Sequence, residues 1–229
     1  MTPPALAPIE TSDAPTTTEQ VFDALYRAVV TLELPPGARI SEADIAARLG
    51  VSRQPVRDAF FRLGRLNLLL IRPQRPTRVT LISEAELRRA VFLRAAIETA
   101  CLRRAARLVD KADLDRLSEL VEAQSEAIEA GDIEGFRLLD DDFHRALCKA
   151  AQEAHAWTPI AEQKARIDRV RVLTLGATVR DALREHAEIV RALRAGRAAE
   201  AALEAHIERI MGTIPGLRAA QPAYFEENT

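Results

Sequence analysis

The stretch "SEADIAARLGVSRQPVRDAFFRLGRL", residues 41–66, predicts two short helices joined by a tight turn. Ser41, with Asp44 three residues later, forms a variant of the capping box that begins a helix. Gly50 suits the left-handed conformation that ends this first helix, and Ser52 is a typical N-cap for the second. Apolar residues recur at helical spacing in the second helix and predict its buried stripe: Val56, Phe60 and Leu63.

The residues on either side of this pair complete an ordered set of elements. A helix is expected to begin near Thr17 or Thr18 and to run through "EQVFDALYRAVVTLE", and the prolines of "LPPG", residues 34–37, end it. After the pair, "NLLLIRP" and "TRVTLI" are predicted as short extended pieces joined by "QRP". Helix, short helix, turn, helix and a two-stranded wing is the order of a winged helix-turn-helix domain.

Charge is distributed unevenly along the chain. Residues 39–80 contain nine arginines and three acids, a balance of +6, whereas the rest of the chain carries 23 basic and 31 acidic residues, a balance of −8. A basic segment of this kind favours a polyanionic partner, and nucleic acid is the usual one. The alternative is an arginine-rich, solvated pair of helices in an ordinary helical protein.

The exposed start of the second helix is the candidate surface for reading DNA. The major groove of B-DNA admits one such helix, and arginine offers guanine two parallel donors. The helix N-terminus suits a phosphate oxygen, and arginines on a wing can reach the DNA backbone or the minor groove. The candidate residues are Ser52, Arg53, Gln54, Arg57, Arg72, Arg75 and Arg78.

The chain after residue 82 is predicted to be entirely helical. Gly131, Gly176 and Gly196 are expected to separate the helices, and "SEAE", residues 83–86, is a capping box for the first of them. The expected helices cover residues 84–108, 112–130, 132–152, 156–174, 179–195 and 198–212.

The expected fold is therefore mainly α, with a winged helix-turn-helix domain followed by an all-α helical bundle. The Pro- and Thr-rich residues 1–17 are expected to form a flexible arm. Residues 18–82 are expected to form the winged helix-turn-helix domain, residues 83–213 the all-α domain, and residues 214–229 a C-terminal tail.

Composition restricts the class of protein. Cys101 and Cys148 show no CxxC spacing, which indicates reduced thiols and no disulfide framework. No apolar run reaches the roughly 18 residues that a membrane helix needs. The N-terminus lacks a basic start followed by an apolar stretch, so it does not read as a secretion signal. We expect a cytoplasmic protein with no membrane association.

Three of the four histidines fall on apolar faces of different expected helices. Asp140 and His144 lie beside the buried stripe of "LLDDDFHRAL", four residues apart on one face, and His186 and His206 occupy inward positions in their own stripes. A lone inward histidine is usually a satisfied core residue. Burying several unpaired polar groups costs about 1–3 kcal/mol each, so a shared partner is favoured. Three imidazoles and one carboxylate suit a divalent ion such as Zn²⁺ or Ni²⁺.

The other acids of this run are predicted to have no role in the site. Asp141 and Asp142 are expected to face solvent, with Asp141 forming a helical ion pair with Arg145 four residues later. His155, in the polar link "QEAHAW", is expected to be exposed.

The N-terminal part resembles the DNA-binding domain of the GntR family of bacterial transcription regulators. The matching elements are "LPPG", the order "SE…IAARLGVSRQPVRDA" and a wing ending in valine. The resemblance implies base or phosphate contacts from Arg53 and Arg57, with supporting contacts from Ser52, Gln54, Arg75 and Thr77. Many members have glycine at the wing tip, where this chain has Gln74 and Pro76.

The helical part resembles the FCD class of effector domain found in the FadR subfamily of the same family. The matching motifs are "DDDFHRAL", "REHAEIV" and "AALEAHI". The resemblance implies a metal held by Asp140, His144, His186 and His206, and a small organic acid that binds against it. Arg94, in "LRAAIE", is the first choice for a contact to that carboxylate, with Arg169 and Arg171 as further candidates. For all three arginines the alternative is a surface salt bridge.

The preferred hypothesis is a dimeric, metabolite-responsive regulator that binds operator DNA and is not an enzyme. One short recognition helix reads too few base pairs, so paired heads on a palindrome are expected. Two rivals stay open: a helical metal-dependent hydrolase, with Glu185 beside His186 as its acid, and a metal-free architectural DNA-binding protein.

Overall fold

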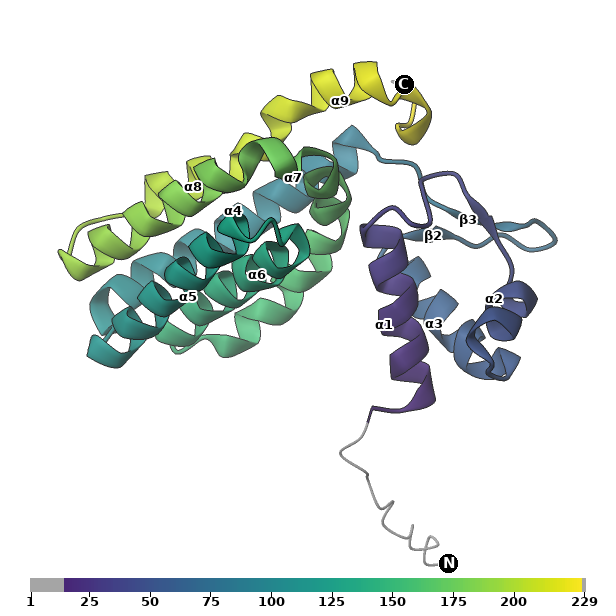
Figure 1. Ribbon diagram of the computed structural model, residues 1–229, viewed down its shortest axis with the longest axis horizontal. Helices are drawn as coiled ribbons and strands as arrows, with labels where there is room; N and C mark the ends of the chain where they lie inside the picture. The colour runs from purple at the N-terminus through teal and green to yellow at the C-terminus, as the bar shows by residue number, and fades with distance from the viewer. Residues whose placement is uncertain (1–14, 228–229) are drawn as a thin grey trace, which may run out of the picture.

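The computed structural model describes residues 15–227, so most of the expected N-terminal arm lies outside the described residues. An N-terminal head and a helical body lie side by side (Figure 1). Within residues 15–227, no helix is both long and apolar enough to cross a membrane. The head contains the helices α1 (Thr17–Val30), α2 (Glu42–Leu49) and α3 (Arg53–Arg65). The rest of the chain contributes α4 (Glu84–Leu108), α5 (Lys111–Glu129), α6 (Ile133–Ala150), α7 (Trp157–Arg194), α8 (Glu200–Glu208) and α9 (Ile214–Ala220).

The helices of the head begin and end where their caps predict. Thr16 caps α1 in a capping box with Glu19. Ser41 accepts a hydrogen bond from the backbone N–H of Asp44 at the start of α2, and Gly50 ends that helix with φ of 67°. The predicted stripe of α3 is buried and packs on α1, which fixes the opposite face of α3 toward solvent.

The wing belongs to a sheet with one strand more than predicted. β2 (Leu69–Leu70) and β3 (Thr77–Val79) form the expected hairpin, and β1 (Arg39–Ile40) pairs antiparallel with the other edge of β3. Gln74, at the tip, has φ of 59°, the left-handed conformation that explains why glycine suits this position. The wing therefore keeps its turn without the glycine.

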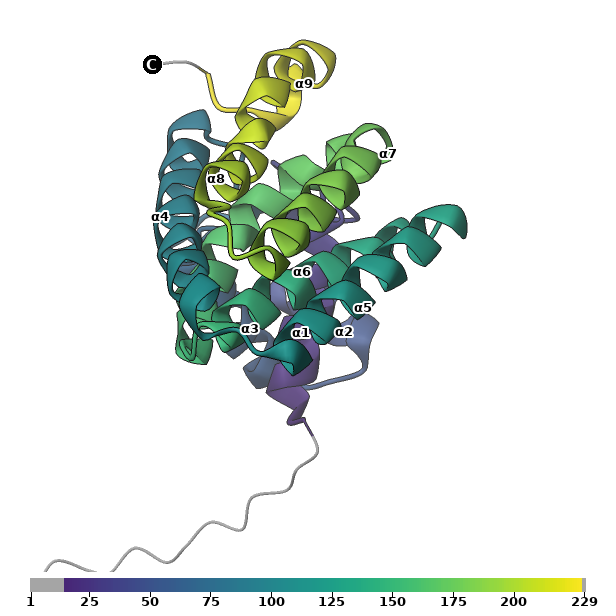
Figure 2. The same cartoon turned by 90° about the vertical axis from the view of Figure 1, so that its left-hand side faces the viewer.

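The helical body packs α4, α5, α6, α7 and α8 around one core, as an end-on view shows (Figure 2). The aromatic anchor of this core is Phe143 of α6, which is fully buried. Aliphatic side chains from the neighbouring helices belong to the same core: Leu102, Leu117, Ile167, Ile189 and Leu203. The inward faces of α6, α7 and α8 are thereby fixed, and these are the faces that carry the histidines.

The prediction of two helices over 156–174 and 179–195 is wrong. The structure has a single helix, α7, of 38 residues. Gly176 sits within it with nothing near the position a Cβ would take. A glycine inside a helix costs only about 1 kcal/mol, which tertiary packing along α7 outweighs. The first part of α7 contacts the head and the last part carries His186.

One cap and one helix end differ from the predictions. Ser83 is the N-cap of α4, but its side chain makes no capping hydrogen bond, so the predicted capping box is absent. The helix expected over 198–212 ends at Glu208 and continues as a 3₁₀ turn, Arg209–Thr213.

The segment expected to be a tail is folded as far as it is described. After α9 and a 3₁₀ turn (Pro222–Tyr224), Phe225 is buried and pairs with Ile82 in a parallel bridge. The backbone N–H of Ile82 donates to Tyr224, and that of Glu226 donates to the carbonyl of Ile82. The C-terminal segment is therefore hydrogen-bonded to Ile82, in the connection between β3 of the head and α4 of the body.

Candidate metal centre and DNA-binding face

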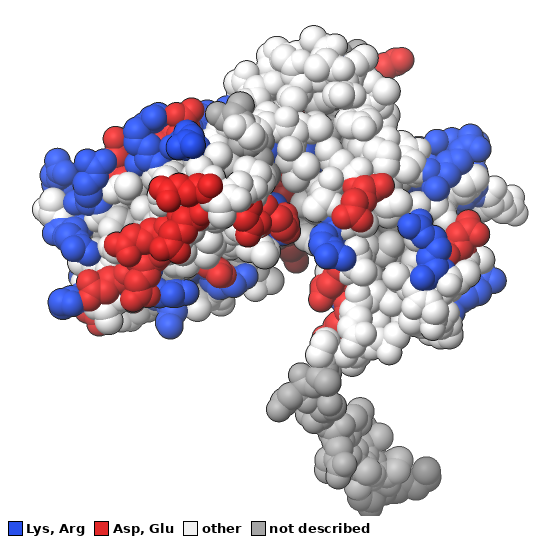
Figure 3. All heavy atoms as spheres, in the orientation of Figure 1, with Lys and Arg blue, Asp and Glu red and all other residues white. Residues whose placement is uncertain are grey.

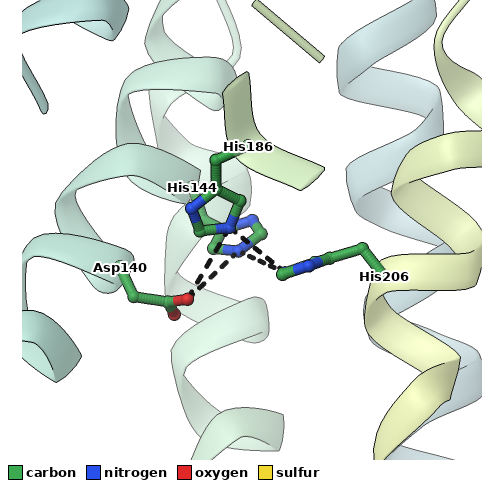
Figure 4. A group of neighbouring side chains, drawn as sticks. All are labelled: Asp140, His144, His186 and His206. Atoms are coloured by element: carbon green, nitrogen blue, oxygen red, sulfur yellow. Dashed lines mark hydrogen bonds and ion pairs between the residues drawn. The ribbon is translucent and has the colours of Figure 1, made fainter. Parts of the chain in front are cut away.

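Four side chains from three helices converge in the middle of the body (Figure 4). Asp140 and His144 come from α6, His186 from α7 and His206 from α8, and their ligand atoms all lie within 4.8 Å of one another. The Nε2 atom of His206 is 3.3 Å from Nε2 of both His144 and His186. Asp140 Oδ1 is 3.9 Å and 3.7 Å from the Nε2 atoms of His144 and His186.

The outer nitrogen of each ring faces an oxygen acceptor. His186 Nδ1 lies 2.8 Å from the amide oxygen of Gln124, and His206 Nδ1 lies 2.8 Å from Glu185. His144 Nδ1 lies 2.6 Å from Glu98 Oε2, at an angle that is poor for a hydrogen bond. Such partners place the ring proton on Nδ1, which leaves all three Nε2 lone pairs directed into the cluster.

The charge state of the cluster suits a cation. Burial, together with His206, holds the pKa of His186 well below its ordinary value. Burial and His144 do the same for the pKa of His206, so both rings are neutral near pH 7. Burial alone would raise the pKa of Asp140, but Arg171 and Lys164 outweigh burial and hold that pKa well below its usual range.

The spacing of the donors fits a tetrahedral ion. Ligand atoms about 2.0–2.1 Å from a zinc ion at tetrahedral angles lie about 3.4 Å apart. The two Nε2 separations of 3.3 Å match that edge, and the Asp140 oxygen lies slightly farther out. The three Nε2 atoms in this buried cluster lie close together, and a divalent ion would supply a positive centre for them and for the Asp140 oxygen.

Asp140 is held in position from the opposite side by two cations. Arg171 donates to both of its oxygens, at 2.6 Å and 2.7 Å, and Lys164 Nζ lies 3.5 Å away. An ionised carboxylate has about four lone-pair sites, so Oδ1 can accept from Arg171 and still face the imidazoles. Arg171, predicted as an effector contact, thus reaches the site through Asp140.

The prediction for Asp141 is wrong. Its carboxylate is half-buried and lies 2.9 Å from Lys164, whereas the pair with Arg145 is formed by Asp142 at 2.7 Å. Lys164 is 1% exposed and its charge draws the acid inward. The sequence pattern on α6 alone could not show a lysine contributed by α7.

A cavity of about 40 Å³ adjoins the cluster, which is room for roughly three waters or one carboxylate group. Arg94, Arg171 and His206 line it. Arg94 is 2% exposed, and its Nε donates to Glu98 at 2.5 Å. Its Nη2 atom is buried and has no partner among the described residues. The structure therefore places Arg94 in a buried ion pair beside the cluster and not in a surface salt bridge.

Other candidate residues lie elsewhere or were not foreseen. Arg169, the third predicted effector contact, is not among the residues around this cavity and instead contacts Thr80. Arg209 lines the cavity and binds Glu185 at 2.9 Å, but sequence reasoning missed it. The partners of the ring nitrogens were missed as well, because each lies on a helix far away in sequence.

The DNA-binding candidates on α3 share one exposed face. Arg53 and Arg57 extend from the first two turns, with 65% and 61% of their side chains exposed, and both lie near Glu42 of α2. Gln54 donates to Asp58 on the same helix. The Ser52 side chain makes no capping hydrogen bond. These polar groups stand at a helix N-terminus whose opposite face is buried, which is the geometry for entry into a groove.

The wing candidates divide into two groups. Arg72 and Arg75 are exposed near the tip, whereas Thr77 is half-buried in β3. Arg78 is also half-buried, and its Nη1 donates to the carbonyl of Gly37, so it supports the sheet. Lys and Arg atoms gather on the side of the head that carries α2 and the wing (Figure 3).

Comparison with known families divides the chain as its structure does. Residues 17–79 match the model of the bacterial regulatory proteins of the gntR family, and residues 90–209 match the FCD domain. The second match contains all four residues of the cluster.

Known relatives extend over nearly the whole chain. The transcriptional repressor RspR of Escherichia coli is 36% identical over 225 residues, which cover 96% of this chain and 99% of RspR. A putative GntR transcriptional regulator from Rhodococcus has a solved structure that matches with a TM-score of 0.69 at 28% identity, covering 87% of this chain and 97% of its own. The structure of Escherichia coli McbR/YncC matches in fold, with a TM-score of 0.72 at 23% identity over 91% of this chain and 100% of McbR.

Proposed function

The chain belongs to the GntR family of bacterial transcription regulators and carries an FCD effector domain, and on that premise we propose how its two parts cooperate. It is a DNA-binding regulator and not an enzyme, so the metal-dependent hydrolase is set aside. The head would bind operator DNA through α3 and the wing, and the body would bind a divalent ion and a small carboxylate. Binding of the carboxylate in the body would change the affinity of the head for the operator.

One observation carries the metal and effector proposal. The Nε2 lone pairs of His144, His186 and His206 converge with Asp140, beside a buried Arg94 nitrogen that lacks a partner. These four residues would hold Zn²⁺ or Ni²⁺, and Glu98, Gln124 and Glu185 would orient the rings. A bound ion supplies a positive centre to which an anion can bind. The free nitrogen of Arg94 would add a charge-assisted hydrogen bond to a carboxylate in the adjoining cavity.

We expect the ligand to weaken operator binding by about 5–150-fold, which corresponds to a coupling of about 1–3 kcal/mol. The probes are small carboxylates that raise the melting temperature of the metal-loaded protein. The operator probe is a DNA duplex selected from random sequence with the wild-type protein. Titration of this duplex with and without each carboxylate measures the coupling.

The Arg94→Gln variant is the control for this experiment. Its affinity for the duplex without ligand should match that of the wild type, because Arg94 lies in the body and away from α3. Its stabilisation by the carboxylate should be lost. A carboxylate that stabilises the wild type and leaves duplex affinity unchanged would contradict a switch, although not the ligand site.

A dimer is part of this proposal, and α4 offers a surface for it. Phe92 and Leu93 are 70% and 44% exposed on neighbouring positions of this helix. Burying a phenylalanine side chain stabilises an interface by about 1.5–3 kcal/mol. In a two-fold symmetric dimer each contact occurs twice, once from each chain. The Phe92→Glu variant should therefore shift from dimer to monomer in light scattering after gel filtration. Leu138→Glu, at a 51% exposed position of α6, is the matched control and should stay dimeric. A monomeric wild type, or a dimeric Phe92→Glu variant, would remove α4 from the interface.

A further inference from the structure

A second cavity lies where the head joins the body, and it is separate from the one beside the metal cluster. Its volume is about 190 Å³. Its walls come from the connection between β3 and α4, the start of α4, the first half of α7 and the C-terminal segment. Arg166 and Arg169 of α7 line it, together with Thr80 and Ser83 of the connection.

Arg169 brings a buried charge to this cavity. Its side chain is 3% exposed, and burial together with Arg166 lowers the pKa of its guanidinium to about 10. Its Nη1 atom donates to the carbonyl and hydroxyl oxygens of Thr80, at 2.7 Å and 3.2 Å. Its Nε atom is buried without a partner, and it forms no ion pair within residues 15–227. Glu226 acts on it only from beyond ion-pair distance, and a buried guanidinium that forms no ion pair is costly.

A second arginine adds to this excess of positive charge. Arg166 donates to the amide oxygen of Gln163, and its Nε atom also lacks a partner in the described part of the chain. Two acids line the same cavity. Glu86 is already paired with Arg89, and Glu226 is exposed at the end of the described chain. Neither acid forms an ion pair with Arg166 or Arg169 among the described residues.

The opposite wall of the cavity presents groups that can donate hydrogen bonds to an anion. Ser83 is the N-cap of α4, a helix of 25 residues, and its hydroxyl makes no capping hydrogen bond. The N-terminus of a long helix carries unsatisfied N–H groups and a positive partial charge. Two guanidiniums that form no ion pair among the described residues, one of them almost fully buried, and an uncapped helix start therefore border the same space.

We propose that this cavity at the joint binds a small oxyanion, a carboxylate or a phosphate, between the guanidiniums of Arg166 and Arg169 and the start of α4. The anion would neutralise the two arginines and fasten the connection between head and body to α7. This site is independent of the metal cluster, since it shares no residue with the cavity there.

Thermal unfolding with inorganic phosphate and with acetate, each at constant ionic strength, tests the proposal. A ligand at 100 times its dissociation constant should raise the melting temperature of a chain of this size by about 5–10 °C. The Arg166→Gln variant should lose this shift, while Arg180→Gln, at an exposed position of the same helix, should keep it. Comparing the two anions distinguishes a carboxylate from a phosphate.

Two further variants separate this site from the cluster and from simple structural roles. Arg94→Gln alters the other cavity, where a carboxylate is expected to bind, and it should keep the full shift with phosphate. Arg169→Gln should lose it, and Arg166→Gln remains informative if Arg169→Gln fails to fold, because Arg166 is only half-buried. Equal shifts in the wild type and in Arg166→Gln, or no shift with either anion, would overturn the proposal.

Discussion

Replacing His144 with Ala should abolish stoichiometric binding of a divalent ion. His144 supplies one of three converging Nε2 atoms from a fully buried position. Removing a residue that only hydrogen-bonds to a metal ligand lowers metal affinity by about 10–100-fold. Removing the ligand itself should therefore lower the affinity by more than about 100-fold. Elemental analysis after equilibration with Zn²⁺ or Ni²⁺ should find about one ion per wild-type chain and none in the variant.

The exposed His155 provides the matched control. It lies 3.5 Å from Glu153 on the surface, and His155→Ala should keep the full complement of metal. A chelator should lower the melting temperature of the wild type and of His155→Ala, but not that of His144→Ala, because only a folded site binds the ion. Metal-free wild-type protein after equilibration with both ions would contradict the metal centre.

Replacing both Arg53 and Arg57 with Ala should nearly eliminate specific operator binding. Each arginine at the start of α3 is expected to contribute about 1–3 kcal/mol through base or phosphate contacts. The double variant should bind the selected duplex about 2–6 kcal/mol more weakly than the wild type, and more weakly than either single variant. The two losses are not expected to add strictly, because both arginines lie near Glu42. Fluorescence anisotropy at a fixed salt concentration measures this, and circular dichroism should show unchanged helix content.

Arg65→Ala is the control on the same helix. Arg65 is exposed in the last turn of α3, at the end away from the predicted groove contact. Its removal should change duplex affinity by less than about 1 kcal/mol. Full operator affinity in the Arg53→Ala, Arg57→Ala double variant would refute α3 as the reading helix.

Features of the fold that depend on local chemistry were predictable from the sequence. Residues close in sequence determine the caps at Ser41 and Gly50 and the buried stripe of α3, and the structure contains all of these features. Helix phase was predictable too, because burial follows the 3.6-residue period. That period alone placed His144, His186 and His206 on inward faces, and all three are buried.

Features that depend on distant partners could not be predicted. β1 has only two residues and becomes a strand because β3 pairs with it across about 40 positions of sequence. Gly176 predicted a break that packing along α7 prevents. Phe225 has no local pattern that shows its bridge to Ile82. In each case a contact from far along the chain decides the local conformation.

The same limit applies to the candidate site. The sequence pattern predicted four converging residues, yet it placed Asp141 in solvent and offered Arg169 as a candidate contact to the effector. Lys164 and Thr80, which determine where these two side chains lie, come from other segments. The sequence could not identify Glu98, Gln124 and Glu185 as partners of the imidazole rings, because contacts to Nδ1 from other helices produce no regular spacing in the sequence.

The continuity of α7 has a mechanical consequence. Arg169, which grips the connection to the head, and His186, which faces the cluster, are 17 residues apart on the same helix, or about 25 Å at 1.5 Å per residue. An unbroken helix transmits tilt along its length as a rigid lever does. A rotation of about 10° around the histidine end displaces the other end by about 4 Å, on the order of the one-turn shifts by which packed helices change state. Had Gly176 divided the helix, that angular movement would be absorbed at the hinge, and the head would not follow.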